Sequence, residues 1–109
     1  MAAQKTPIAA GMAMLVLKLL SEKDRYGYEM IDVLRRRSQN VFELKAGTLY
    51  PLLHGLQEQG LLSVYEKETL GKIRKYYRIT EKGRQALKEK TEEWQHYSQA
   101  VTQVLTTEG

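Results

Sequence analysis

Hydrophobic residues recur along the chain with the period of an α-helix, most regularly between residues 47 and 59. Apolar positions there fall at i, i+3, i+4 and i+7, which places one stripe along the helix: Leu49, Leu52, Leu53 and Leu56. Pro51 favours a start close to Gly47 or Thr48, because proline fits the first turn of a helix. Gly60 follows where a left-handed residue commonly ends a helix. We therefore expect a short amphipathic helix that stops just before Gly60.

Two more helices are predicted upstream. Thr6 and Pro7 can serve as the N-cap and first residue of a helix over residues 7–20, which is apolar on nearly every side. A small domain covers only one face of such a helix, so the other faces are expected to contact a partner. A polar turn over residues 21–25 precedes the second helix, residues 27–37, whose three terminal arginines complement the helix dipole.

Beyond residue 61 the pattern changes to the alternation of β-strands. Residues 62–67 and 75–79 predict a hairpin around the turn Thr69-Leu70-Gly71-Lys72, with apolar side chains at alternate positions. Thr80 is then expected to cap a long C-terminal helix. Positions on that helix recur at alternating spacings of four and three, as in a helix that packs along another helix: Leu87, Thr91, Trp94, Ser98, Val101 and Leu105.

Three helices, a hairpin and a last helix indicate a mainly α fold with a small β-hairpin. This order is typical of a winged helix-turn-helix followed by a C-terminal dimerisation helix. The expected parts are a flexible N-terminal arm (1–6), the winged helix-turn-helix DNA-binding domain (7–79) and the dimerisation helix (80–109). Such a domain places its third helix in the major groove and its hairpin on phosphates. A homodimer would bind double-stranded DNA at an inverted-repeat operator, with half-sites about 10 bp apart.

Composition narrows the alternatives. The 109 residues suffice for one domain with a modest core, and the absence of cysteine excludes disulfides and thiolate zinc sites and favours a cytoplasmic location. No apolar run reaches the ~18 residues of a membrane span, so no membrane partner is expected. The net charge is +4, and it is uneven: residues 1–79 hold 13 Lys and Arg against 8 Asp and Glu, residues 80–109 hold 4 against 5. A basic front part suits a phosphate-binding surface.

Candidate DNA-binding residues lie on the second and third helices and on the hairpin: Tyr28, Lys45, Thr48, Tyr50, Pro51, His54, Lys72, Arg74 and Lys75. Hydroxyls near a helix N-terminus and cations on a hairpin suit phosphate oxygens. Plainer alternatives exist, since Thr48 can cap its helix and Tyr28 and Tyr50 can pack. His54 can be solvated, and the hairpin cations can be a solvated charge cluster. Arg78 suits DNA contact and bracing of the sheet equally.

Four segments, in this order, resemble the PadR family of bacterial transcriptional regulators: YGYEM at 26–30, GTLYPLL at 47–53, QGLL at 59–62 and RKYYRITEKG at 74–83. The single C-terminal helix is similar to the short branch of the family. The resemblance implies a homodimeric winged-helix repressor, often of detoxification or efflux genes, released by a small aromatic or planar effector. His54 stands where many relatives carry Lys or Arg, which removes a permanent charge from the groove-facing surface.

The resemblance also implies a role for the sole tryptophan. In short members of the family a tryptophan of the last helix flanks an effector pocket at the dimer axis, and Trp94 would take that role here. Ile8, Met12 and Tyr97 are candidates to line the same pocket. The alternative is that Trp94 only anchors the dimer. The expected dimer interface comprises Leu15, Leu87, Trp94, Val101 and Leu105.

Enzymatic chemistry is not expected. The glutamates of the last helix suit an exposed face better than acid–base work, and the two histidines have no cluster of further ligands nearby. Residues 55–60 have the glycine spacing of a phosphate loop, but Leu61 and Leu62 replace the required Lys-Ser/Thr. We therefore expect no catalytic residue, metal or cofactor. Two other classes stay open, a drug-sequestering protein and a protein-binding winged helix, neither with specific DNA binding.

Overall fold

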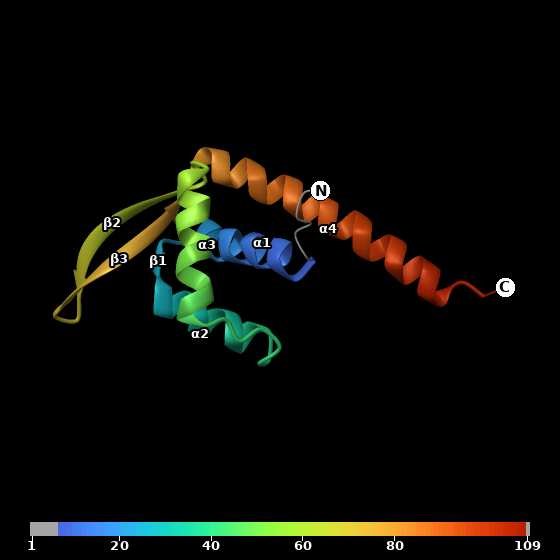
Figure 1. The fold of residues 1–109 in the computed structure, drawn as a ribbon, viewed down its shortest axis with the longest axis horizontal. Helices are drawn as coiled ribbons and strands as arrows, with labels where there is room; N and C mark the ends of the chain where they lie inside the picture. Colours follow the sequence, from blue (N-terminus) through green and yellow to red (C-terminus); the bar gives the residue numbers. More distant parts are fainter. Residues whose placement is uncertain (1–6, 109) are drawn as a thin grey trace.

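The structure, a computed structural model, describes residues 7–108 and the side chains of residues 11–108. The elements follow in the order α1 (Pro7–Glu22), β1 (Arg25–Tyr26), α2 (Gly27–Arg37), α3 (Ala46–Glu58), β2 (Leu62–Thr69), β3 (Lys72–Ile79) and α4 (Glu81–Thr106). In Figure 1 the hairpin of β2 and β3 projects from one side of the helical body, and α4 extends past the other. The predicted mainly α winged helix-turn-helix is confirmed. The predicted N-terminal arm and the Thr6 cap lie outside the described residues.

The core lies between the first three helices and the sheet. Its completely buried large side chains come from α1, α2 and α3: Val16, Leu17, Leu20, Met30, Leu49 and Leu53. Leu49 and Leu53 belong to the stripe that the helical period predicts, because the apolar face of an amphipathic helix turns toward the core. The helix α2 has its predicted bounds, and α1 runs two residues beyond its predicted end.

The end of α3 is set by a left-handed glycine, as predicted. Gly60 has φ +79°, and the backbone N–H groups of Gly60 and Leu61 donate to carbonyls of the last turn, both at 2.9 Å. This pair of hydrogen bonds is the Schellman closure of a helix. The helix begins at Ala46, one or two residues before the predicted start at Gly47 or Thr48. Pro51 therefore lies one turn inside α3 rather than in its first turn.

The sheet has the strand order β1-β3-β2, with antiparallel neighbours. The predicted hairpin is confirmed, but its strands are longer than predicted, because they reach to a two-residue turn, Leu70-Gly71. Both turn residues have positive φ, +54° and +81°, as in a type I′ turn. The polar turn predicted over residues 21–25 is wrong at both ends, because α1 includes Ser21 and Glu22 and because Arg25 starts β1. A strand of two residues has no alternation by which sequence could reveal it.

The helix α4 begins as part of the body and ends as an exposed rod. The predicted Thr80 cap is confirmed, since its Oγ1 accepts a hydrogen bond from the Gly83 N–H at 3.0 Å. Leu87, one turn on, still packs against the core, whereas Leu105 is 78% exposed. The molecule is accordingly elongated, 62 × 29 × 26 Å. Within residues 7–108, no helix is both long and apolar enough to cross a lipid bilayer.

Candidate nucleic-acid interface

The outward face of α3 lies opposite its buried leucines. Thr48, Pro51 and His54 are exposed on this face, and Lys45 is exposed at its entrance. Lys45 also occupies the N-cap position, without a side-chain hydrogen bond, so the capping alternative for Thr48 is wrong. The Thr48 hydroxyl is therefore available near a helix N-terminus, where the partial positive charge of the helix favours anions.

Tyr50 lies between the protein interior and solvent. Its ring is partly exposed, but its hydroxyl packs on the first residue of α2, where a Cβ added to Gly27 would clash with it. Burial and the neighbouring Tyr28 hydroxyl both raise the pKa of Tyr50. The Tyr50 hydroxyl therefore packs against the protein, as the alternative held, while part of the residue stays accessible to solvent. Tyr28 itself is exposed beside it on α2.

His54 has an acidic neighbour. Its Nε2 lies 3.3 Å from Oε2 of Glu58, one turn later on α3, and both side chains are exposed. His54 therefore presents to solvent a hydrogen-bonding group beside a carboxylate rather than a permanent cation.

The two faces of the β2–β3 hairpin, which we call the wing, carry different charges. Residues directly opposite each other on the two strands share a face. One face carries the pairs Lys67–Arg74, Thr69–Lys72 and Tyr65–Tyr76, and we call it the outer face. The inner face continues from the core-facing residues and carries Glu66 opposite Lys75 and Glu68 opposite Ile73. The three predicted wing cations therefore do not share one surface, because Lys75 lies on the inner face beside an acid.

Tyrosine rings hold the cations of the outer face in place. The Arg74 guanidinium lies 4.4 Å from the centroid of the Tyr26 ring, and the Lys67 ammonium lies 5.2 Å from that of Tyr76. The Tyr76 ring in turn contacts those of Tyr26 and Tyr65, at centroid distances of 5.5 and 5.7 Å. Such cation–π contacts restrict long side chains without neutralising them. Lys67 was missed in the sequence, because its face depends on the strand register.

Arg78 braces the sheet. Its Nη2 lies 2.9 Å from Oδ2 of Asp24, and the Tyr65 hydroxyl donates to the same oxygen at 2.7 Å. Burial opposes ionisation of Asp24, but the hydrogen bonds from Tyr65 and Arg78 outweigh it and lower the pKa of this carboxyl. Of the two roles that the sequence left open for Arg78, the geometry supports bracing, since its charge is already paired.

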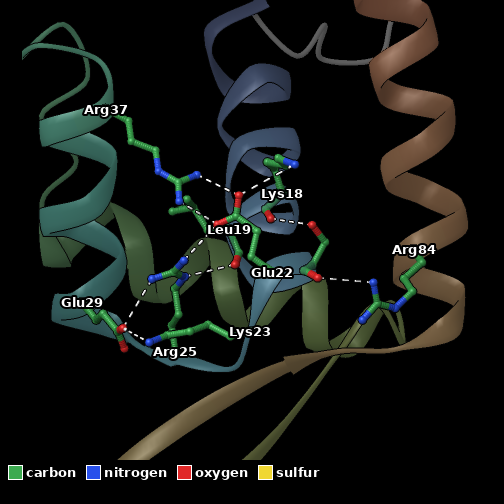
Figure 2. Close-up of polar contacts among 9 residues, drawn as sticks. Lys18, Leu19, Glu22, Lys23, Arg25, Glu29, Arg37 and Arg84 are labelled. Atoms are coloured by element: carbon green, nitrogen blue, oxygen red, sulfur yellow. Dashed lines mark hydrogen bonds and ion pairs between the residues drawn. The ribbon is translucent and has the colours of Figure 1, made fainter.

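A second ionic cluster joins α1 to α2 behind the interface (Figure 2). The buried Arg25 donates from Nε to the Leu19 carbonyl at 3.1 Å and from Nη2 to Glu22 at 2.9 Å. Arg37, at the end of α2, binds both carboxylate oxygens of Glu22, at 2.9 and 2.8 Å. These hydrogen bonds, with that from Arg37 the strongest, lower the pKa of Glu22 to about 2. Because fifteen residues separate Glu22 from Arg37, no local pattern in the sequence indicates the pair.

The predicted effector and dimer residues divide between the body and the exposed half of α4. Met12, Leu15 and Leu87 are half-buried and pack against the core. Trp94 is 46% exposed, and its ring centroid lies 5.8 Å from that of Tyr97. The side chain of Ile8 lies outside the described residues.

A shallow apolar hollow of about 300 Å³ lies next to Trp94 along α4. It is lined by Tyr97, Ala100, Val101, Val104 and Leu105. Two of the predicted interface residues thus line an open apolar surface in the single chain. In the part of the chain that the structure describes, no three His, Asp or Glu side chains converge as metal ligands would.

Comparison with known proteins gives consistent matches. Residues 16–89 match the transcriptional regulator PadR-like family. The chain is similar to Transcriptional regulator YqjI from Escherichia coli (strain K12), with 37% identity over 82 residues. That match covers 75% of this chain and 38% of the longer relative.

Solved structures show the same architecture. A transcriptional regulator from Clostridium thermocellum superposes with a TM-score of 0.83 at 32% identity, covering 91% of this chain and 97% of that one. A PadR family transcriptional regulator from Eggerthella lenta DSM 2243 gives a TM-score of 0.78 at 36% identity, covering 89% and 83%. The similarity extends well beyond the four sequence segments on which the resemblance was based.

Proposed function

The chain belongs to the PadR-like family of transcriptional regulators, and from this premise we propose that it is a homodimeric DNA-binding repressor whose operator is an inverted repeat. The observation that carries the proposal is the exposed polar face of α3, opposite the buried Leu49, Leu53 and Leu56. A helix presented in this way can enter a major groove without exposing the core. Thr48, Pro51 and His54 are the proposed groove-facing residues, with Lys45 on phosphate.

The outer face of the wing is proposed to bind phosphates. Lys67, Lys72 and Arg74 share this face and none of them forms an ion pair among the described residues, while Asp24 at its base is bound by Arg78 and Tyr65. The inner face carries Glu66 and Glu68 beside a single lysine. Since phosphate binding requires uncompensated cations, the outer face is the better phosphate contact.

Salt dependence of DNA binding tests this assignment. The purified protein is titrated into a labelled duplex from the region upstream of its own gene, at several salt concentrations. Each phosphate contact contributes about −0.9 to the slope of log K against log salt, so we expect a steep slope and a loss of about one unit in Lys67→Ala. Lys75→Ala is the matched control and should keep the wild-type slope.

Three results would count against the proposal. Weak, salt-insensitive association of the wild type with any duplex would favour a drug-sequestering or protein-binding winged helix. Equal binding to duplexes of scrambled sequence would show that the protein recognises no specific operator. Equal loss of slope in the two lysine variants would reject the outer face as the phosphate contact.

A small aromatic effector is the finer part of the proposal. The exposed pair of Trp94 and Tyr97, next to the apolar hollow of α4, supports binding of a flat apolar molecule between two copies of the chain. An effector releases DNA only if it binds the non-repressing arrangement more tightly. Planar aromatic compounds should therefore quench Trp94 fluorescence and weaken operator binding together. Quenching without any change in DNA affinity would show that the protein binds the compound but that the compound does not control repression.

A further inference from the structure

The tip of the wing carries an exposed leucine in a strained backbone conformation. Leu70 has φ +54° at the first position of the two-residue turn, and its side chain is 91% exposed. Side chains with a Cβ are disfavoured in this left-handed region, and type I′ turns favour Asn or Asp followed by Gly. Gly71, with φ +81°, fits its own place in the turn. Leu70 is thus the unfavourable residue of a turn that is otherwise well formed.

Folding does not account for this residue. A side chain left almost wholly in water gains no burial energy, and the conformation of its backbone is unfavourable for leucine. Ile73, three residues on, is 72% exposed, so the tip presents two aliphatic side chains to solvent. An exposed aliphatic residue in a strained turn suggests a contact made outside the folded chain.

The charges around the tip indicate the chemistry of that contact. Lys72 follows the turn directly and is exposed, and Lys67 and Arg74 form the next pair on the outer face, held over the Tyr76 and Tyr26 rings. An apolar tip bordered by cations is complementary to a duplex groove, where sugar atoms and base edges lie between two rows of phosphates. Minor-groove proteins use Leu, Ile and similar side chains in this way.

We propose that Leu70 is a minor-groove contact of the wing, with its side chain against sugars and base edges while the neighbouring cations bind the flanking phosphates. This inference rests on the proposed function, since it requires that the chain binds duplex DNA. It assigns to the wing an apolar contact in addition to the phosphate contacts, and it gives a reason for leucine at a position where asparagine would suit the turn better.

The decisive variant is Leu70→Asn, because it should affect folding and binding in opposite directions. Asparagine followed by Gly71 suits the type I′ turn, so the Tm of the variant should be equal to or above that of the wild type. Its operator affinity should fall about three- to tenfold, as expected when a partly buried leucine contact is lost. The slope of log K against log salt should not change, because no cation is removed.

Matched variants separate this effect from others. Leu70→Ala should lose affinity to a similar degree, whereas Leu70→Met, which conserves side-chain volume, should keep it. Lys72→Ala should show the complementary behaviour, with an unchanged Tm and a slope lower by about one unit. Wild-type affinity in both Leu70→Asn and Leu70→Ala would overturn the inference while leaving the proposed function intact. Failure of the wild type to bind duplex DNA at low salt would instead reject the proposed function itself.

Discussion

Two glycines show how closely single residues determine the packing around the interface. An added Cβ at Gly27 would clash with the Tyr50 hydroxyl, and one at Gly83 would clash with the Leu61 carbonyl oxygen. The obstacle at Gly27 is the end of a side chain that can shift, whereas the obstacle at Gly83 is backbone. The same geometry explains why Tyr50 sits on α2 and why α4 leaves the sheet so close to the end of α3.

We expect Gly83→Ala to lower the free energy of unfolding by about 3 kcal/mol and Gly27→Ala by about 1 kcal/mol, the range found when extra atoms are forced into packed sites. Urea unfolding measures both changes. Adding Tyr50→Phe should recover part of the loss in Gly27→Ala, because it removes the clashing hydroxyl.

Gly55→Ala is the control, since a Cβ there meets nothing within 4 Å. Its stability should rise by up to about 1 kcal/mol through helix propensity. Equal losses at the two packed glycines would show that the backbone near Gly83 can move.

At the scale of the elements, one carboxylate connects α1 and α2. Glu22 ends α1 and accepts hydrogen bonds from Arg25 of β1 and Arg37 of α2 (Figure 2). The helix α2 precedes α3, the proposed groove-facing helix, so its angle to α1 contributes to where α3 points. The cluster therefore belongs to the support of the interface rather than to its surface.

Acid should weaken this link within a defined range. The pKa of Glu22 falls from 4.5 to about 2 on folding, chiefly because of its hydrogen bonds from Arg37. A depressed pKa gives stability that is complete above pH 4.5 and is lost as the pH falls towards 2. Glu22→Gln should therefore lose less stability than the wild type between pH 5 and pH 2.5, measured as the urea midpoint. Arg37→Ala should show the same reduced pH dependence. An unchanged profile in both variants would mean that solvent screens the pair completely.

The helical period made most of these elements predictable from the sequence. Contacts between segments far apart in the sequence were not predictable from it. The leucine stripe of α3, the Gly60 stop and the Thr80 cap follow from local spacing, and all three were predicted correctly. By contrast, β1 needs Tyr76 as its partner, 50 positions away from Tyr26. The separation of Lys75 from Lys72 likewise depends on the exact register of the hairpin, which a predicted turn of four residues leaves undetermined.

At the scale of the whole molecule, the elongated shape makes the chain unlike a self-contained domain. The outer half of α4 leaves the body with Trp94, Tyr97, Val104 and Leu105 exposed on one side. Apolar residues spread over this side of a helix make it suitable for packing against another helix. A second copy of the chain would cover this surface and bring two α3 helices into one assembly, as an inverted-repeat operator requires.

Val101→Asp tests that assembly. A carboxylate in the middle of an apolar helix contact would be buried without a partner, so the variant should sediment as a monomer at concentrations where the wild type is a dimer. The fold of each chain should persist, because Val101 lies beyond the turns of α4 that pack on the core. Affinity for an inverted-repeat duplex should fall by at least about tenfold, since one half-site then has to be bound alone. Gln99→Asp introduces the same charge away from the apolar side and should leave both properties unchanged. A dimeric Val101→Asp protein would place the contact between copies elsewhere on the molecule.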